Sequence, residues 1–378
     1  MGERPEGLRV GDIHEAKDMF GNGSCQTFLW NHGSRVLVTI RLDGANARQV
    51  RPEPRLEGVN RAAIVYNPVK APLDRLRRAV EEQESLHGWA KSVWHETSGD
   101  DSGLRAAQDA LADDPTVVIV AGGDGTVRAV AEVVHDSGTA LALLPAGTGN
   151  LLARNLGLAL NDVERSVRRA FSGVTRAVDV AVADLENQEA RRSSHVFLVM
   201  AGIGLDAEMA ENTSALAKKR LGWLAYVTPI ARSIVRNRLF HIDYRVDGGH
   251  VRSSHAHTVI VGNCGTLTGN MLLIPRAHVD DGLLDVVMLR PKGRFGWAGI
   301  GTRLTLQGIA HRSRFGRRML QLTPDLRALA YAQGRRFEVR FETPHGVELD
   351  GDSFGEVARA RITVRPGALL VCVGEDAA

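Results

Sequence analysis

Residues 117–126, VVIVAGGDGT, join an apolar run to a glycine-rich turn that carries one acidic side chain. The aliphatic run is typical of a buried strand, and the apolar spacing of residues 127–136 predicts a helix directly after the turn. Glycines let the backbone approach a ligand closely, and the free N–H groups at a helix N-terminus attract anions. The pattern therefore predicts a loop that binds phosphate.

Asp124 separates this loop from general phosphate-binding loops, because the segment matches neither GxxxxGK[ST] nor GxGxxG. A carboxylate beside phosphates repels them unless Mg²⁺ or a proton transfer requires it. The loop therefore favours phosphoryl transfer over simple nucleotide storage. The alternative is an ordinary strand-to-helix turn in which Asp124 only caps the following helix.

Strands alternate with helices from residue 61 to about residue 147. We expect strands at 61–68, 89–97, 116–123 and 140–147, and helices at 73–86, 102–113 and 127–135. Such alternation predicts a parallel, doubly wound sheet that binds its ligand at the carboxyl ends of the strands. Four polar residues fall at those ends: Asn67, Thr97, Asp124 and Thr148.

The pattern changes near residue 179, where short strand-like runs with turn residues between them begin. We expect strands at 178–184, 195–202, 240–248, 254–263, 282–290, 336–342, 347–352 and 360–367. The fold class is therefore α/β plus β, with an N-terminal α/β nucleotide-binding domain and a mainly antiparallel C-terminal β-sandwich.

These patterns divide the chain into three parts. Residues 1–58 form an extension with a hairpin at 25–42, residues 59–178 the α/β domain, and residues 179–366 the β-sandwich. A last strand in 367–378 is expected to return to the α/β domain. A length of 378 residues suits two or three domains.

Composition is that of a globular protein, with 44% hydrophobic and 24% charged residues. Cys25, Cys264 and Cys372 are too widely spaced for a metal motif or a disulfide framework, which favours the cytoplasm. We expect neither a signal peptide nor a spanning helix, because no apolar run approaches about 18–20 residues.

Two segments, 216–240 and 290–318, place basic residues among apolar side chains, including Trp223 and Trp297. Basic amphipathic stretches with tryptophan suit the surface of an anionic membrane, and so favour peripheral association. The alternative is a pair of core-packing helices with solvated basic faces. Nucleic acid is not expected as a partner, because aromatic content is only 5% and no recognition motif is present.

The order of the motifs resembles one known family. GGDGT at 122–126, LPAGTGNLLARNL at 144–156, AGIGLDAE at 201–208, DGLLDV at 281–286 and ELDGD at 348–352 occur in sequence. Together they resemble the diacylglycerol kinase catalytic family of soluble lipid kinases, which includes the sphingosine kinases. The resemblance implies an ATP-dependent, Mg²⁺-using lipid kinase whose active site lies between its two domains, and it covers roughly residues 60–375.

By this resemblance, ATP contacts Asn67, Thr97, Gly122, Gly123, Asp124, Gly125 and Thr126. The loop of Gly147, Thr148, Gly149 and Asn150 lies beside the nucleotide and helps to close its site. Arg154 either neutralises phosphate charge or is a surface cation, and Asp206 resembles the acceptor-side aspartate of the family.

The LDGD segment carries the second half of the expected chemistry. Asp350 and Asp352 stand where the family has an Asp-Gly-Glu element, whose first carboxylate is the proposed base for the lipid hydroxyl. A positioned carboxylate that accepts the proton of an alcohol helps it attack. Asp350 and Asp124 remain joint candidates for the base, Asp124 being also the expected Mg²⁺ ligand. Residues i and i+2 of one strand would turn both LDGD carboxylates to one face; the alternative is an ordinary Asp-Gly hairpin turn.

Asp281 and the backbone of Leu283 resemble a second, structural Mg²⁺ site of the family, for which oxygen ligands are suited.

The chain departs from the family at NPVKAP, where Lys70 follows the NP dipeptide, at Leu151 after Asn150, and at DGD in place of DGE. These departures leave the acceptor lipid open. Two alternatives remain, an NAD kinase-type small-molecule kinase and a non-catalytic lipid or nucleotide sensor on the same fold.

Overall fold

The computed structural model describes residues 24–31, 34–41, 49–50, 59–204, 239–265, 274, 277–290 and 329–374. Asp206 and both basic amphipathic segments, apart from their end residues, lie outside these ranges. Within the extension, β1 (Ser24–Asn31) and β2 (Ser34–Arg41) form an antiparallel hairpin, and β3 (Gln49–Val50) pairs with β8 (Thr175–Glu186). None of the helices in the described part of the chain is long and apolar enough to cross a membrane.

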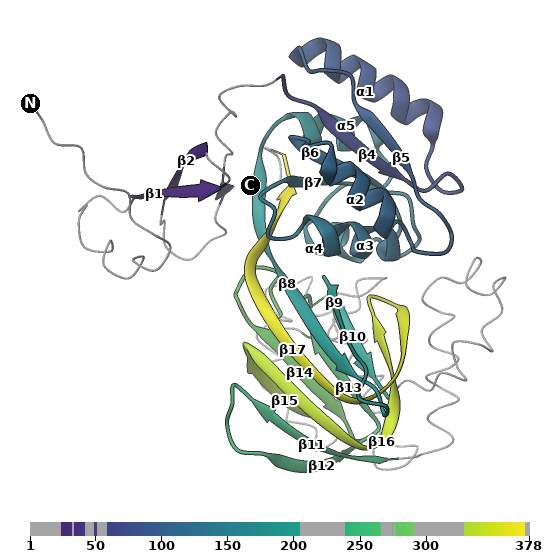
Figure 1. Ribbon diagram of the computed structural model, residues 1–378, viewed down its shortest axis with the longest axis vertical. Coiled ribbons are helices and arrows are strands. Elements are labelled where there is room, and N and C mark those ends of the chain that lie inside the picture. The colour runs from purple at the N-terminus through teal and green to yellow at the C-terminus, as the bar shows by residue number, and fades with distance from the viewer. Residues whose placement is uncertain are drawn as a thin grey trace, which may run out of the picture.

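The α/β half is a parallel sheet with helices on both faces (Figure 1). β5 (Val93–Glu96), β4 (Ala62–Tyr66), β6 (Val117–Gly122) and β7 (Ala140–Pro145) lie side by side in that order. The helices are α1 (Leu73–His87), α2 (Leu104–Ala112), α3 (Asp124–Val134), α4 (Leu151–Asn155) and α5 (Val163–Phe171).

Alternation along the strands explains the two covered faces. Ala62 and Ile64 of β4 pack in a cluster with α1 and α5, whereas Ala63 and Val65 pack in another cluster with α2, α3 and α4. Successive side chains of a strand point to opposite faces, so a strand that is apolar at every position needs cover on both sides. The expected doubly wound sheet is confirmed.

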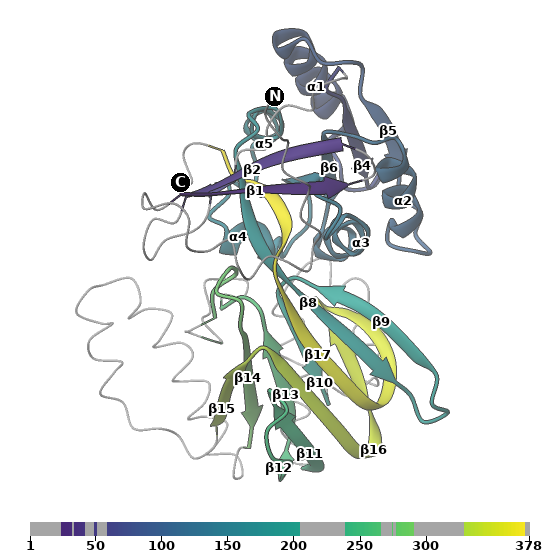
Figure 2. The same cartoon turned by 60° about the vertical axis from the view of Figure 1, so that its left-hand side comes forward.

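The second half is built almost wholly of antiparallel strands (Figure 2). Its strands are β8, β9 (Arg192–Phe197), β10 (Met200–Ile203), β11 (Phe240–Val246), β12 (Arg252–Ala256), β13 (Thr258–Gly262), β14 (Leu284–Leu289), β15 (Leu329–Gly334), β16 (Arg336–Leu349) and β17 (Asp352–Cys372). A separate buried cluster, which includes Phe197, Ile242 and Phe337, fills its interior.

Two long strands connect the halves. β8 and β17 pair antiparallel from Glu186 opposite Arg359 to Thr175 opposite Cys372, and both run from one half into the other in Figures 1 and 2. At its end, β17 pairs in parallel with β7 through Val371 and Leu141. The result, among the described residues, is one continuous sheet of 15 strands.

The expected strand at 195–202 is interrupted in the structure. β9 ends at Phe197 and β10 begins at Met200, so Leu198 and Val199 leave the ladder. The segment 254–263 is divided in the same way into β12 and β13 at His257, whereas 347–352 and 360–367 are absorbed into the longer strands β16 and β17.

The two leucines of α1 allow a test of the α/β core. Leu76 is fully buried and Leu86 is 72% exposed. Leu76→Ala should lower the free energy of unfolding by about 2–5 kcal/mol, because a cavity is left in place of the side chain. Leu86→Ala should change it by less than about 0.5 kcal/mol. Urea titration followed by circular dichroism measures both, and equal effects would contradict the packing described.

Candidate active site

The GGDGT segment links β6 to α3. Gly123 is extended and precedes the helix, and Asp124 is the first helical residue. A Cβ on Gly122 would lie 2.6 Å from the Cβ of Thr126, so a larger residue at 122 would displace the first turn. The backbone of Asn67 donates to Ala121 O, which joins the end of β4 to this loop. The turn thus presents backbone without side chains at the carboxyl edge of the sheet.

A second loop, residues 147–150, packs directly on the first. A Cβ on Gly147 would lie 2.6 Å from the Cα of Gly123. Asn150 holds the loop closed, because its Oδ1 accepts from Gly147 N at 3.0 Å and its Nδ2 donates to Gly147 O at 2.8 Å. Asn150 itself has φ of 49°, in the left-handed region that asparagine tolerates.

Asp124 joins the two loops. Its carboxylate accepts hydrogen bonds from Asn150 N at 2.8 Å and from Leu151 N at 2.6 Å. It therefore caps the start of α4, whereas the alternative stated from the sequence was a cap on the helix that follows the turn. Burial raises the pKa of Asp124, while these two N–H groups and the charge of Lys70 oppose the rise.

The remaining nucleotide-side residues lie around these loops. Asn67 Oδ1 accepts from the N–H groups of Val69 and Lys70, and Lys70 Nζ would be 3.3 Å from a Cβ on Gly123. Thr97 is buried, and its hydroxyl has no hydrogen-bond partner among the described residues. Arg154 donates from Nε to Gly149 O at 2.7 Å and so supports the second loop, whereas Thr148 at its tip is exposed.

Asp350 lies at the turn between β16 and β17. Asp350 and Gly351 have φ of 49° and 90°, and Leu349 pairs with Asp352, which is a two-residue hairpin turn. Its carboxylate accepts three consecutive N–H groups, from Leu198 at 2.8 Å, Val199 at 2.9 Å and Met200 at 3.0 Å. These bonds account for the interruption between β9 and β10.

Asp350 titrates far from its ordinary range. Burial raises its pKa to about 6, against the three N–H groups that lower it, and the negative charge of Asp124 raises it further. The two carboxylates therefore act on each other electrostatically, although one belongs to the α/β half and the other to the β half.

Asp352 points a different way from Asp350. A Cβ on Gly125 would lie 2.9 Å from its Oδ2, so this carboxylate packs against the first turn of α3. The expectation that both LDGD carboxylates share one face of a strand is wrong, because Asp350 is a turn residue with positive φ rather than part of β17. The charge of Asp124, the first residue of α3, nevertheless acts on Asp350 as well.

The Asp281 region shows a hydrogen-bonded turn. Asp281 Oδ1 accepts from Leu283 N at 3.0 Å, and Asp179 accepts from Gly282 N and Gly367 N. Burial raises the pKa of Asp281. Among the described residues, no group of three or more His, Cys, Asp or Glu side chains could hold a metal ion. A Mg²⁺ site at Asp281 and Leu283 therefore stays a prediction.

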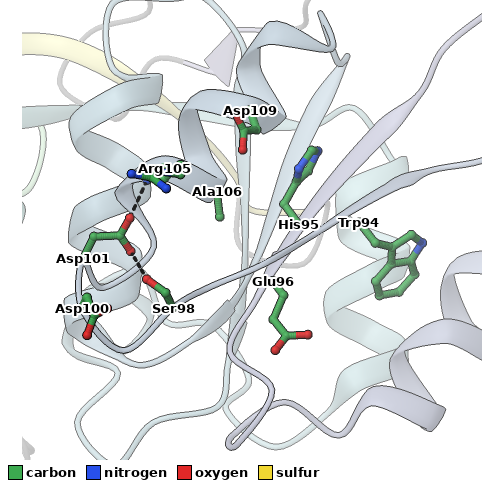
Figure 3. Close-up of a pocket in the computed structure, with 9 residues that line it drawn as sticks. All are labelled: Trp94, His95, Glu96, Ser98, Asp100, Asp101, Arg105, Ala106 and Asp109. Atoms are coloured by element: carbon green, nitrogen blue, oxygen red, sulfur yellow. Dashed lines mark hydrogen bonds between the residues drawn. The ribbon is translucent and has the colours of Figure 1, made fainter.

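A hollow lies at the end of β5 (Figure 3). Its volume is about 440 Å³, and its lining includes Glu96, Asp100, Asp101 and Asp109. Ser98 donates to Asp101 on its rim. An acidic lining repels phosphate, so the glycine loops are the better place for phosphates.

Comparison with known proteins supports the same architecture. Residues 61–183 match the diacylglycerol kinase catalytic domain, and residues 199–300 match the "YegS C-terminal NAD kinase beta sandwich-like domain". A protein of Pseudomonas aeruginosa named "Probable lipid kinase YegS-like" is 31% identical over 82% of this chain and 94% of its own length. The "Diacylglycerol kinase" of Bacillus subtilis is 25% identical over 61% of this chain and 74% of its own.

The crystal structure of a diacylglycerol kinase from Bacillus anthracis has the same fold. It superposes with a TM-score of 0.63 at 23% identity and covers 86% of this chain and 100% of that one. An α/β domain joined to a β-sandwich-like domain, with these matches, defines a kinase. The chain belongs to the diacylglycerol kinase catalytic domain family of lipid kinases.

Asp350 predicts a pH dependence of stability. Its pKa of about 6 in the folded protein exceeds the value of about 3.9 in an unfolded chain. The stabilisation from the bound proton is therefore fully present below about pH 4 and is lost as the pH rises through about 6. Relative to Asp350→Asn, the wild type should lose on the order of 2 kcal/mol of unfolding free energy between pH 4.5 and pH 7.

Urea titrations at several pH values measure this difference. Asp74→Asn, at an exposed position in the first turn of α1, is the matched control and should follow the wild-type profile. Parallel profiles for Asp350→Asn and the wild type would contradict the raised pKa.

Proposed function

We propose that this protein transfers the γ-phosphoryl group of ATP to the hydroxyl of a lipid of the diacylglycerol or sphingoid class. The single observation that carries the proposal is the meeting of two loops with different chemistry. A phosphate-type glycine turn begins at Gly122, and the carboxylates of Asp350 and Asp352 approach the same helix start from the β half.

The nucleotide side has the features that phosphates require. Gly123 and Gly147 approach so closely that a ligand meets backbone N–H groups rather than side chains. Lys70 supplies a cation beside Gly123. The buried hydroxyl of Thr97, which has no partner in the described part of the chain, can donate to a nucleotide oxygen. Asn67 and Asn150 act by holding their loops in shape.

On the acceptor side, we assign Asp350 as the general base. An alcohol is a poor nucleophile at neutral pH, and a base is most effective when its pKa lies close to the working pH. A pKa of about 6 meets that condition. Three backbone N–H groups fix the carboxylate, and its Oδ2 accepts only one of them, which leaves a lone pair for the proton of the lipid hydroxyl.

Asp124 is then the residue that would hold Mg²⁺. This ion takes one or two carboxylates, waters and phosphate oxygens rather than an all-protein cage, so a single aspartate at the phosphate loop fits it. When bound, Mg²⁺ would neutralise charge on the phosphates. Asp124 also fixes the spacing of the two glycine loops through Asn150 and Leu151.

We further propose that the enzyme works at the surface of an anionic membrane, as its basic, tryptophan-bearing segments suggest.

A lipid panel tests the proposal directly. The wild type should label a long-chain alcohol when it is incubated with γ-labelled ATP, Mg²⁺ and mixed micelles of diacylglycerols, ceramides or sphingoid bases. Asp350→Asn should lower kcat by at least about 100-fold, the usual range for loss of a general base. The wild-type kcat/KM should fall below about pH 6, where Asp350 is protonated.

Asp74→Asn controls for the loss of one carboxylate at a distant exposed site and should keep wild-type activity. NAD is included in the panel as an acceptor. Labelling of NAD without labelling of any lipid would replace the proposal by the NAD kinase alternative, and ATP binding without transfer to any acceptor would support the sensor alternative.

A further inference from the structure

Arg128, which no motif includes, lies one turn beyond Asp124 on α3. Its side chain is 8% exposed and lies between two carboxylates. Nε donates to Asp352 Oδ2 at 3.3 Å, and a terminal guanidinium nitrogen donates to Glu132 Oε2 at 2.8 Å. The guanidinium also lies 4.7 Å from the centre of the Phe354 ring. One planar cation thus contacts both halves of the protein, since Asp352 and Phe354 belong to β17.

The contacts extend to a third element. Glu132 Oε1 lies 3.2 Å from His195 Nδ1 on β9, and the His195 ring is 4.5 Å from the Phe354 ring. Besides Asp352, Arg128 therefore contacts Glu132 and Phe354, and His195 contacts both of these residues. A guanidinium whose orientation is fixed by a carboxylate and an aromatic face can in turn fix the orientation of a second carboxylate.

The Asp352 side chain can rotate, and a contact with Arg128 would restrict that rotation. Its backbone is held by the hairpin turn, but its side chain is 38% exposed. Its position against Gly125, one residue after Asp124, places it at the junction of the glycine turn and the β half. Among the described residues, Arg128 is its only side-chain hydrogen-bond partner.

Charge balance gives a second reason for the contact. Asp124, Asp350, Asp352 and Glu132 bring four carboxylates to the neighbourhood of one helix, and like charges disfavour each other. Arg128 contacts two of them directly. Without it, Asp352 would be expected to turn toward solvent, away from Asp350 and Asp124.

We propose that Arg128 is a positioning residue of this kinase, which holds the Asp352 carboxylate against the first turn of α3 so that the acceptor side is aligned with the phosphate loop. The inference rests on the proposed function and adds a residue to it. It differs from a purely structural role, in which Arg128 would only connect α3 to β9 and β17.

Kinetics of four variants separate these roles. Arg128→Gln should lower kcat about tenfold or more, with the KM for ATP changed less than about twofold, because the side-chain hydrogen bonds of Arg128 within the described residues go to Asp352 and Glu132 and not to the glycine loops. Asp352→Asn should lower kcat similarly. The double variant should be no slower than Asp352→Asn alone, because Arg128 acts through Asp352. Arg128→Lys should be intermediate, since a lysine cannot bridge two carboxylates in the same geometry.

Glu132→Gln is the discriminating control. It weakens one of the two contacts that orient Arg128 and leaves those with Phe354 and Asp352, so kcat should fall by less than in Arg128→Gln. A structural connection would make Glu132→Gln as harmful as Arg128→Gln. Arg168→Gln, at an exposed position on α5, controls for loss of a cation and should have wild-type kinetics. Wild-type kcat in Arg128→Gln, or losses that multiply in the double variant, would overturn the proposal.

A crystal structure of Arg128→Gln gives an answer that does not depend on activity. The Asp352 carboxylate should leave Gly125, while the turn at Asp350 keeps its three N–H bonds. An unmoved Asp352 would overturn the inference even if every lipid is phosphorylated. Absence of lipid phosphorylation by the wild type would instead reject the proposed function, and the position of Asp352 would still decide the role of Arg128.

Discussion

The structure of the site depends on one buried carboxylate that accepts three backbone N–H groups in a row. Asp350 interrupts what would otherwise be a single strand at Leu198 and Val199, and it ties the β16–β17 turn to that interruption. Buried N–H groups without partners are costly, so the three residues and the aspartate stabilise one another's positions. The same burial gives the carboxylate its affinity for a proton.

In the α/β half, Asp124 likewise both holds backbone segments in place and is affected by burial. Its bonds to Asn150 and Leu151 keep two glycine loops at the distance of backbone contact, while burial raises its pKa. Each of the two aspartates therefore accepts hydrogen bonds that hold the backbone in place, and burial makes its ionised form unfavourable. The charge of Lys70 offsets part of that cost at Asp124, whereas Arg128 pairs with the neighbouring Asp352.

Local sequence was sufficient for the features that depend on short segments. The strand, glycine turn and helix around Asp124 follow from apolar spacing, and the doubly wound sheet follows from strands that are apolar at every position. The Asp-Gly pair at 350–351 is also readable as a turn. The roles of individual site residues came from the family resemblance rather than from local sequence.

Contacts between segments far apart in the chain could not be predicted from local sequence patterns. Arg128 and Asp352 are 224 positions apart, and the amphipathic pattern of α3 does not show whether a cation at 128 faces solvent or a second domain. The division of 195–202 into two strands was missed for the same reason, because the acceptor for its N–H groups lies about 150 residues later. The i, i+4 spacing of Arg128 and Glu132 was the one local signal of a held guanidinium.

The sharing of β8 and β17 by both halves has a mechanical consequence. The expected boundary at 178/179 falls inside a hydrogen-bonded ladder, and the only register shift in that ladder lies between Arg365 and Leu369. Asp179 accepts from Gly367 at this bulge, which anchors the bend. A change in the angle between the halves must then twist the two-stranded ribbon of β8 and β17. The connection should therefore resist such a change elastically, unlike a flexible linker.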